Sequence, residues 1–400
     1  MRVILTRIGV RKMMNNLDFF KTKFEDKISK SKSIFIIGHK NPDFDSIGSA
    51  IGIFKLCKIL GKKSNIIVNE DDLSLQPGVK LLMDSVGKNI PFITVEDYKE
   101  RLIKSLNKTY IDVFDEATEE EQDFLLRNIK VKNSTLIITD TNNIDLIHIK
   151  DYLHTFENVI IIDHHKKINN PGLPNDLEFI NQNYSSACEI VATLLHKYEK
   201  KYPSKIATAI ASGIVLDTDN FKRNTTENTY KVYTILKKNG VTDENIRKIF
   251  RKDFETDKLV KNLVFNNGNA IEFFNLISNN NISIILNRES PETIYKPEMI
   301  GMAADERQEY DDVDATIVMG KVLDQEENKV IKISVRTNGY IDGGRLLREY
   351  CVNDEKNNGG GAVTSAAAII QDNDLIAEEE KLLDYIKSTP PDHFIKKLKK

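Results

Sequence analysis

The chain of 400 residues has no tryptophan and only three cysteines, Cys57, Cys188 and Cys351. Their odd number and wide spacing exclude a disulfide framework and a Cys-x-x-Cys zinc site, so we expect them to be buried and reduced. No apolar run reaches the ~18 residues that a transmembrane helix needs. The apolar stretch near residue 4 is also too short for the core of a signal peptide. These absences predict a soluble cytoplasmic protein that has no membrane partner.

A strong charge of either sign is also missing. The 57 basic and 60 acidic residues leave a formal net charge of −3, which argues against a broad surface for long nucleic acids. A small phosphate ligand held by metal ions is compatible with this charge. The length exceeds one ordinary core and predicts two domains.

What the chain does contain is a set of apolar segments that run directly into acids and imidazoles. Such segments cover residues 33–38, 136–139, 160–162 and 210–216. The side chains that follow them are His39, Asp43, Asp45, Asp140, Asp163, His164, His165 and Asp217. Alternation of strands and helices in this part predicts an α/β fold with a doubly wound, mainly parallel sheet. Ligands bind such sheets beyond the carboxyl ends of the strands, where these side chains lie.

Six of these residues have the character of metal ligands. A single one would more often be a solvated carboxylate, a helix cap or an ordinary histidine, but six at the ends of four segments favour a shared site. They are His39, Asp43, Asp45, Asp140, His164 and Asp217. Mixed imidazole and carboxylate ligands indicate divalent ions, with Mn²⁺ as the first choice and Mg²⁺, Co²⁺ or Zn²⁺ behind it. Two such ions roughly 3.5–4 Å apart would activate a water and clamp a phosphate.

The last third predicts a smaller α/β domain with a mixed sheet, separated from the first by a cleft. Residues 282–286, 314–319 and 330–335 are expected strands, and Ser334 and Arg336 share one face of the last. Helices are expected over 345–351 and, after a glycine run, over 362–370. The predicted organisation is a lead-in (1–30), a catalytic domain (31–250), a linker (251–275), a substrate-binding domain (276–374) and a charged tail (375–400).

The ordered motifs resemble those of the DHH phosphoesterase family. The four motifs are His39-x-x-x-Asp43-x-Asp45, Asp140-Thr141, Asp163-His164-His165 and Gly213-Ile214-Val215-Leu216-Asp217-Thr218. The last third resembles the DHH-associated domain, whose glycine run corresponds to Gly359, Gly360 and Gly361. The resemblance extends over about residues 30–372, and four motifs in order are far more specific than Asp-His-His alone.

This resemblance implies a role for each residue. His39, Asp43 and Asp140 would hold one metal, and Asp45, Asp140, His164 and Asp217 the other. His165 would contact the substrate phosphate, while Asp163 would orient a metal-binding imidazole. Arg336, with Ser334 beside it, and the glycine run would contact the nucleotide. The alternatives are an exposed charge on a sheet face for Arg336 and a flexible loop for the glycines.

The first motif is most similar to GdpP-type cyclic di-AMP phosphodiesterases. The implied reaction is hydrolysis of cyclic di-AMP to linear 5′-pApA by a water that two metals activate. Asn142 stands where those enzymes usually have a histidine, which favours a short-oligoribonucleotide exonuclease and 3′-phosphoadenosine 5′-phosphate phosphatase instead. Ala362 replaces the histidine that usually follows the glycine run, which favours a nucleotide-binding protein without activity. The family also makes a homodimer an expectation.

Overall fold

The structure is a computed structural model. It describes residues 17–394 except 70–76, 105–113, 115–116, 169–173, 175, 252, 266–268, 276–279, 289–290, 311–312, 325, 353–356 and 372–373. The first part of the predicted lead-in and the basic end of the predicted tail therefore lie outside the described residues. The chain divides into two compact units, Met1–Arg251 and Lys252–Lys400. All three cysteines are free and buried.

The first unit is built on a six-stranded sheet in the order β3-β2-β1-β4-β5-β6. Its strands are β1 (Ser33–Ile37), β2 (Ser64–Ile67), β3 (Phe92–Ile93), β4 (Val131–Thr139), β5 (Phe156–Asp163) and β6 (Leu177–Ile180). All five pairings are parallel, which confirms the predicted fold class. The sequence did not predict β3 and β6, because both strands are short and are flanked by polar residues.

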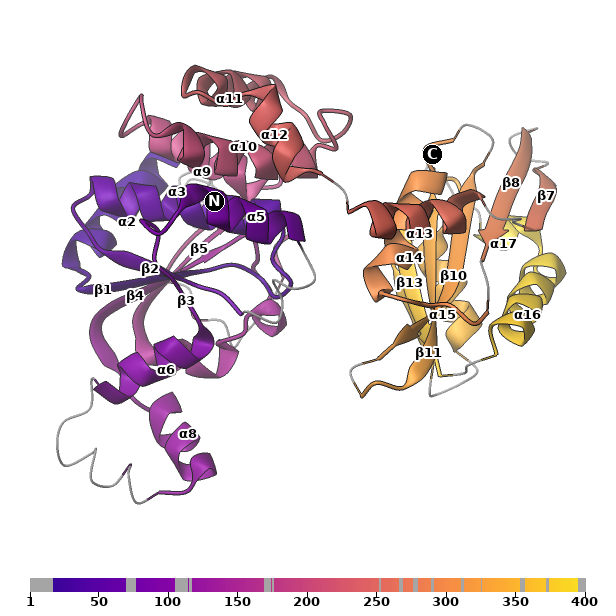
Figure 1. Ribbon diagram of the computed structural model, residues 1–400, viewed down its shortest axis with the longest axis horizontal. Helices are drawn as coiled ribbons and strands as arrows, with labels where there is room; N and C mark the ends of the chain where they lie inside the picture. Colours follow the sequence, from indigo (N-terminus) through magenta and orange to yellow (C-terminus); the bar gives the residue numbers. More distant parts are fainter. Residues whose placement is uncertain are drawn as a thin grey trace, which may run out of the picture. The chain divides into compact units, whose positions relative to one another are not determined.

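Helices cover both faces of this sheet (Figure 1). One side holds α2 (Leu17–Lys30), α3 (Phe44–Ile59), α5 (Pro77–Val86), α9 (Ala187–His196), α10 (Ser204–Asp217), α11 (Glu227–Lys238) and α12 (Asp243–Ile249). The other side holds α6 (Val95–Lys104) and α8 (Glu119–Arg127), together with the short 3₁₀ helices η1 (Ile144–Leu146) and η2 (Lys150–Thr155). Because side chains alternate along a strand, Ile34 and Ile36 belong to the first core and Phe35 and Ile37 to the second.

Glycines allow the helices of the first side to approach one another. A Cβ at Gly48 would lie 2.4 Å from the Ala209 carbonyl oxygen, and one at Gly52 would lie 2.4 Å from Val191 Cγ1. Both glycines of α3 therefore face α9 and α10. α3 is buried between these helices as well as against the strands.

The second unit contains a seven-stranded sheet with both parallel and antiparallel pairs, which confirms the predicted mixed sheet. Six strands follow the order β12-β13-β11-β10-β8-β7, and β9 pairs with β10. They are β7 (Asn269–Asn275), β8 (Asn280–Asn287), β9 (Ile294–Tyr295), β10 (Ala315–Leu323), β11 (Lys329–Thr337), β12 (Asn358–Gly361) and β13 (Ser365–Ile370). The helices are α13 (Phe254–Phe265), α14 (Pro297–Arg307), α15 (Gly343–Cys351), α16 (Leu375–Ser388) and α17 (Pro391–Phe394). No described helix has the length and apolar character needed to cross a membrane.

The helix predicted over residues 362–370 is wrong, because this segment forms β13. Alanine favours helices, but here Ala366 and Ala368 are buried and pair with β11 on one side and β12 on the other. Sheet pairing therefore overrides the local propensity. The second unit also extends further than the predicted domain 276–374. Val260 of α13 and Leu382 of α16 are both buried in its cores, within the segments expected to be a linker and a tail.

Candidate metal centre

The loop after β1 and the start of α3 position the first group of side chains. Asp43 is the N-cap of α3, and its Oδ1 accepts hydrogen bonds of 2.9 Å from the backbone N–H groups of both Asp45 and Ser46. Asp45 lies in the first turn of the helix and is fully buried. The Ser46 hydroxyl accepts a hydrogen bond of 3.3 Å from the backbone of His39. The cap therefore fixes the acids and the imidazole relative to one another.

Asp140 follows the last residue of β4 in an unusual backbone conformation. Its φ is +63°, in the left-handed region that aspartate tolerates better than most residues. Its N–H still donates to the carbonyl oxygen of Ile162 at 2.9 Å, so the residue remains tied to β5. Such strain persists where the surrounding structure holds it, often at functional sites. Here it accompanies a carboxylate that is buried at the centre of the cluster.

β5 and α10 supply the remaining side chains. Asp163 is the last residue of β5, and His164 and His165 follow it directly. Asp217 is the last residue of α10. A Cβ at Gly213 would lie 2.7 Å from Asp45 Oδ1, so this glycine lets α10 approach α3 at the cluster. Segments that are far apart in sequence thus meet beyond the carboxyl ends of parallel strands, as the sequence predicted.

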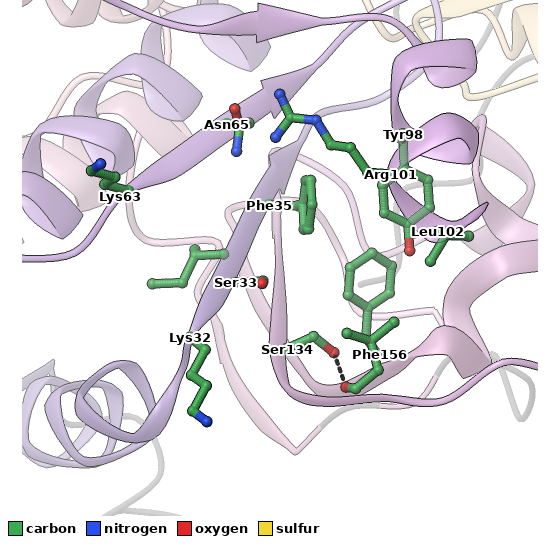
Figure 2. A pocket seen from close by; sticks show the side chains of 12 residues that line it. Lys32, Ser33, Phe35, Lys63, Asn65, Tyr98, Arg101, Leu102, Ser134 and Phe156 are labelled. Carbon is green, nitrogen blue, oxygen red and sulfur yellow. Dashed lines mark hydrogen bonds between the residues drawn. The ribbon is translucent and has the colours of Figure 1, made fainter. Parts of the chain in front are cut away.

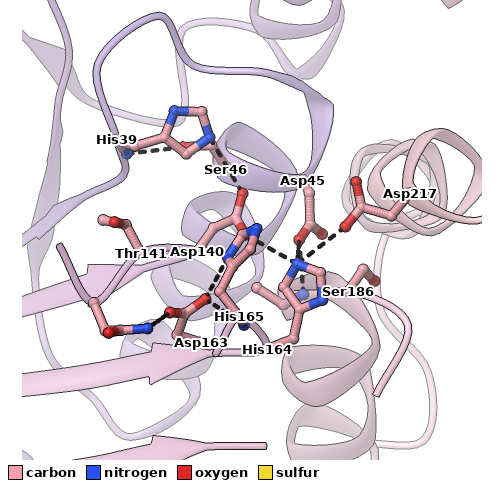
Figure 3. A network of polar contacts seen from close by, with 12 residues as sticks. His39, Asp45, Ser46, Asp140, Thr141, Asp163, His164, His165, Ser186 and Asp217 are labelled. Carbon is pink, nitrogen blue, oxygen red and sulfur yellow. Dashed lines mark hydrogen bonds and ion pairs between the residues drawn. The ribbon is translucent and has the colours of Figure 1, made fainter. Parts of the chain in front are cut away.

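The six predicted metal ligands form two groups, His39, Asp43 and Asp140 in one and Asp45, His164 and Asp217 in the other. Asp140 also lies close to His164 of the second group (Figure 3). In the first, His39 Nε2 lies 3.4 Å from Asp140 Oδ2 and 3.8 Å from Asp43 Oδ1. In the second, His164 Nε2 lies 3.2 Å from Asp217 Oδ2, 3.5 Å from Asp140 Oδ1 and 3.8 Å from Asp45 Oδ2. The two oxygens of Asp140 therefore face different groups, which is the arrangement of a bridging carboxylate.

Two buried atoms at the centre have no hydrogen-bond partner among the described residues. They are Asp140 Oδ1 and His164 Nε2. A buried polar atom without a partner costs free energy, so such atoms need an explanation. Ligand atoms of imidazole and carboxylate lie about 2.0–2.2 Å from a divalent ion such as zinc, and separations above 3 Å between them leave room for it. The donor set and the orphaned atoms therefore fit divalent cations.

The acids of the cluster also repel one another. Burial, followed by the charge of Asp140, raises the pKa of Asp217 to about 7 and raises that of Asp45 well above its usual value. Burial opposes the charging of His39, yet hydrogen bonds to Asp140 and Asp43 raise its pKa to about 11. The converging carboxylates thus favour positive charge among them, which divalent cations would supply.

The N-terminus of α9 supports the most buried acid. Asp45 Oδ2 accepts a hydrogen bond of 2.7 Å from the N–H of Ala187, and Oδ1 accepts one of 2.8 Å from the N–H of Cys188. These amides and the helix dipole favour a negative charge. Ser186 caps the helix, and Glu189 accepts hydrogen bonds from the backbone N–H and the hydroxyl of Ser185.

Asp163 holds His165. Its Oδ1 lies 2.8 Å from His165 Nδ1 and also accepts the His165 N–H at 3.1 Å. His39 Nδ1 lies 2.7 Å from the Lys40 carbonyl oxygen, and the expected role of Asp163 in orienting a metal-binding imidazole stays a prediction. The hydrogen bond with Asp163 raises the pKa of His165 to about 9. The His165 side chain is 56% exposed, so it can meet a substrate.

Asn142 fastens the loop that follows the histidines. Its Nδ2 donates to Asp163 Oδ2 and, at 3.2 Å, to the Lys166 carbonyl oxygen, while its Oδ1 accepts from the N–H of Ile168 at 2.7 Å. The sequence analysis treated Asn142 only as a departure from a family pattern. Two amide functions on a buried side chain explain why asparagine fits this position.

The predicted nucleotide contacts of the second unit have partners within the protein. Arg336 pairs with Asp305 of α14 through two hydrogen bonds of 2.5 and 3.1 Å, and it also donates to the Val335 carbonyl oxygen. Ser334 is buried on the same face of β11. No test of their contact with a nucleotide follows from this geometry, so that role stays a prediction.

The glycine run forms β12, and its close contacts explain two of the glycines. A Cβ at Gly359 would lie 2.6 Å from Cys351 Sγ of α15, and one at Gly361 would lie 2.6 Å from the Ser365 carbonyl oxygen. The intervening Gly360 pairs with Ala367. The run is therefore part of the sheet that packs against α15. Its role in nucleotide binding also remains a prediction.

Comparisons with known proteins agree with this geometry. Residues 33–214 match the family described as "DHH family, N-terminal domain". The chain is 27% identical over 254 residues to the cyclic-di-AMP phosphodiesterase PdeA of Listeria monocytogenes, a match that covers 62% of this chain and 35% of the relative. It thus spans about a third of that relative's length.

The chain is also similar to a relative with a different activity and to a solved structure with a similar fold. The chain is 25% identical over 220 residues to the bifunctional oligoribonuclease and PAP phosphatase NrnA of Mycoplasma genitalium, covering 54% of this chain and 56% of the relative. The crystal structure of an exopolyphosphatase-related protein from Bacteroides fragilis has a TM-score of 0.60 and 20% identity, and the match covers 92% of this chain and 96% of that one. At this identity the likeness concerns the fold alone.

Proposed function

Since the chain belongs to the DHH family of phosphoesterases, we propose that it is a metal-dependent phosphodiesterase that hydrolyses cyclic di-AMP to linear 5′-pApA. The observation that carries the proposal is the pair of adjoining ligand groups joined through Asp140, in which Asp140 Oδ1 and His164 Nε2 are buried and form no hydrogen bond with the described residues. The form of the first motif and the similarity to PdeA support the choice of substrate.

The proposed chemistry needs a pair of divalent cations, with Mn²⁺ as the first choice. His39, Asp43 and Asp140 would hold one cation, and Asp45, Asp140, His164 and Asp217 the other. Bound there, the cations supply Lewis acidity to the phosphate and make a water more acidic. The amides at the start of α9 hold Asp45, and the cap of α3 holds Asp43.

His165 is the residue proposed to meet the scissile phosphate. Its ring is exposed on one side and held by Asp163 on the other, so it presents a proton toward a phosphate oxygen. A water oxygen forms the new bond to phosphorus, the bond to the 3′ oxygen breaks, and that oxygen leaves with a proton. The linear dinucleotide then carries a 5′ phosphate and a free 3′ hydroxyl.

One assay tests the assignment. Purified protein with Mn²⁺ is offered cyclic di-AMP, 5′-pApA and 3′-phosphoadenosine 5′-phosphate in separate reactions, and the products are separated by chromatography. We expect cyclic di-AMP to be converted to 5′-pApA. Turnover of the other two compounds alone would reject the cyclic dinucleotide, and bound metal without any turnover would favour a nucleotide-binding protein.

The second candidate is a short-oligoribonucleotide exonuclease that also removes a phosphate from 3′-phosphoadenosine 5′-phosphate. Asn142 and the similarity to NrnA favour it. Both candidates use the same cluster and differ in the substrate that reaches it. Replacing Asn142 cannot decide between them alone, because this residue also fastens the loop at residues 166–168.

A further inference from the structure

Apart from the metal centre, the first unit has a hollow at the beginnings of the strands. Its volume is about 300 Å³, and residues at or just before the starts of β1, β2, β4 and β5 line it together with α6 (Figure 2). The metal centre follows the ends of β1, β4 and β5. Because these strands are parallel, the hollow lies at their amino ends and the metal centre at their carboxyl ends.

The hollow arises where one face of the sheet changes from apolar to polar. On β2, Asn65 is the neighbour of Phe35 on β1, and Ile67 is the neighbour of Ile37. Ile67 and Ile37 are buried in the core beneath α6, but Asn65 remains half-exposed. No described residue forms a hydrogen bond with the Asn65 side chain. The helix therefore leaves the beginnings of the strands uncovered.

The inner wall of this hollow is aromatic. Phe35, Tyr98 and Phe156 line it, and with exposed fractions of 8%, 1% and 5% each presents only a small part of its ring to the hollow. The rings of Tyr98 and Phe156 are stacked with centroids 5.4 Å apart, and Phe35 meets Tyr98 edge-on at 5.0 Å. Tyr98 also shares a hydrogen bond of 2.6 Å with Thr155, which fixes its orientation. A rigid apolar wall of this kind suits a flat, apolar part of a ligand.

The rim carries only positive charge. Lys32, Lys63 and Arg101 line the hollow, and none of the described residues that line it is acidic. No described residue forms an ion pair with these three cations. Their neighbours behave differently, because Lys62 donates to the Ser29 and Ser31 carbonyl oxygens and Lys104, also on α6, pairs with Glu100 at 3.2 Å. Figure 2 shows Arg101 extending from α6 toward Asn65.

We propose that this hollow is a second, non-catalytic site for a nucleoside monophosphate. The base lies against Phe35, Tyr98 and Phe156, and the phosphate is bound by Arg101, Lys63 and Lys32. An arginine and two lysines match a dianionic phosphate, and the arginine can donate two hydrogen bonds to it. A volume of about 300 Å³ lies at the lower end of small-molecule pockets, which excludes much larger ligands.

Equilibrium dialysis with AMP tests the proposal on the full chain loaded with Mn²⁺. We expect one class of binding sites to weaken about tenfold or more in Arg101→Ala and in Lys63→Ala, because each loses a charge-assisted hydrogen bond. Lys104→Ala is the matched control, since it removes an equal charge from the same helix outside the hollow. Hydrolysis of cyclic di-AMP should be unchanged in all three variants, which separates this site from the catalytic one.

The chemistry of the ligand is tested with its two halves. Adenosine and inorganic phosphate should each bind this site at least about tenfold more weakly than AMP. Photo-crosslinking with 8-azido-AMP should label peptides from β1, β5 or α6. Equal binding of AMP to the wild type and both hollow variants would overturn the proposal. Phosphate binding as tight as AMP binding would also overturn it, because an anion site without base recognition would then explain the data.

Discussion

The metal cluster of the first unit and the predicted nucleotide contacts of the second differ in how far the protein satisfies them. In the cluster, Asp140 Oδ1 and His164 Nε2 are buried and form no hydrogen bond with the described residues. In the second unit, Arg336 has Asp305. Both regions carry residues that a family pattern would mark as functional. In the cluster, atoms of the kind that bind cations lack hydrogen bonds, whereas the guanidinium of Arg336 is already hydrogen-bonded.

The difference shows what a motif can and cannot indicate. Buried polar groups that converge without hydrogen bonds indicate a missing ligand. An arginine that is already hydrogen-bonded within the protein gives no such indication. The Asp305 side chain is 59% exposed, however, so its pair with Arg336 contributes little stability and can be exchanged for a substrate phosphate at a small cost. The following predictions test this contrast.

Asp140→Asn should have the largest effect. It removes the charge shared by both groups of ligands, so we expect the rate of hydrolysis to fall by more than the roughly 10–100-fold that loss of an outer partner causes. The measurements are kcat with cyclic di-AMP and the amount of Mn²⁺ bound per chain. Asp145→Asn, on the exposed surface of η1, is the matched control. Retained turnover with two bound ions would contradict the bridging role.

Metal removal should destabilise the first unit. Four carboxylates repel one another in the cluster, and an ion that binds only the folded state adds about 2.7 kcal/mol at a concentration 100 times its Kd. We expect Tm to rise with Mn²⁺ concentration in the wild type and to change much less in Asp140→Asn. Scanning calorimetry with and without a chelator measures this. An identical Tm under both conditions would mean that the orphaned atoms do not mark a metal site.

Much of the cluster could be predicted from the sequence because its positions follow from strand ends. The apolar runs that end at residues 37, 139 and 162 predict parallel strands. The carboxyl ends of parallel strands lie side by side, and ligands bind there. The partner of Asp163 could not be predicted, since it depends on which ring rotates toward the acid. Nor could β13, because Ala366 and Ala368 favour a helix until β11 and β12 offer hydrogen bonds on both sides. The pair Arg336–Asp305 joins residues 31 positions apart and had no local signal.

Asp163→Asn should have an intermediate effect. The amide keeps the size of the side chain but loses the charge that holds His165 Nδ1, so we expect kcat to fall roughly 10–100-fold with metal content unchanged. His165→Gln should cause a similar loss, and the double variant should lose little more than either single variant. Additive losses in the double variant would show that the two residues act separately.

We expect the smallest effects for Arg336 and Asp305 in the second unit. These variants test whether an arginine that already has a partner in the protein can still bind a ligand. If Arg336 meets the substrate, Arg336→Ala raises KM for cyclic di-AMP about tenfold, because a charge-assisted contact is lost. Asp305→Asn then lowers KM by a few-fold, since the guanidinium no longer exchanges a carboxylate for a phosphate. A purely structural pair predicts a different pattern: both variants lower Tm slightly and to the same extent, and both leave KM unchanged. Steady-state kinetics and thermal unfolding on the same preparations distinguish the two, and a drop in KM for Asp305→Asn alone would show that a satisfied arginine is still available to a ligand.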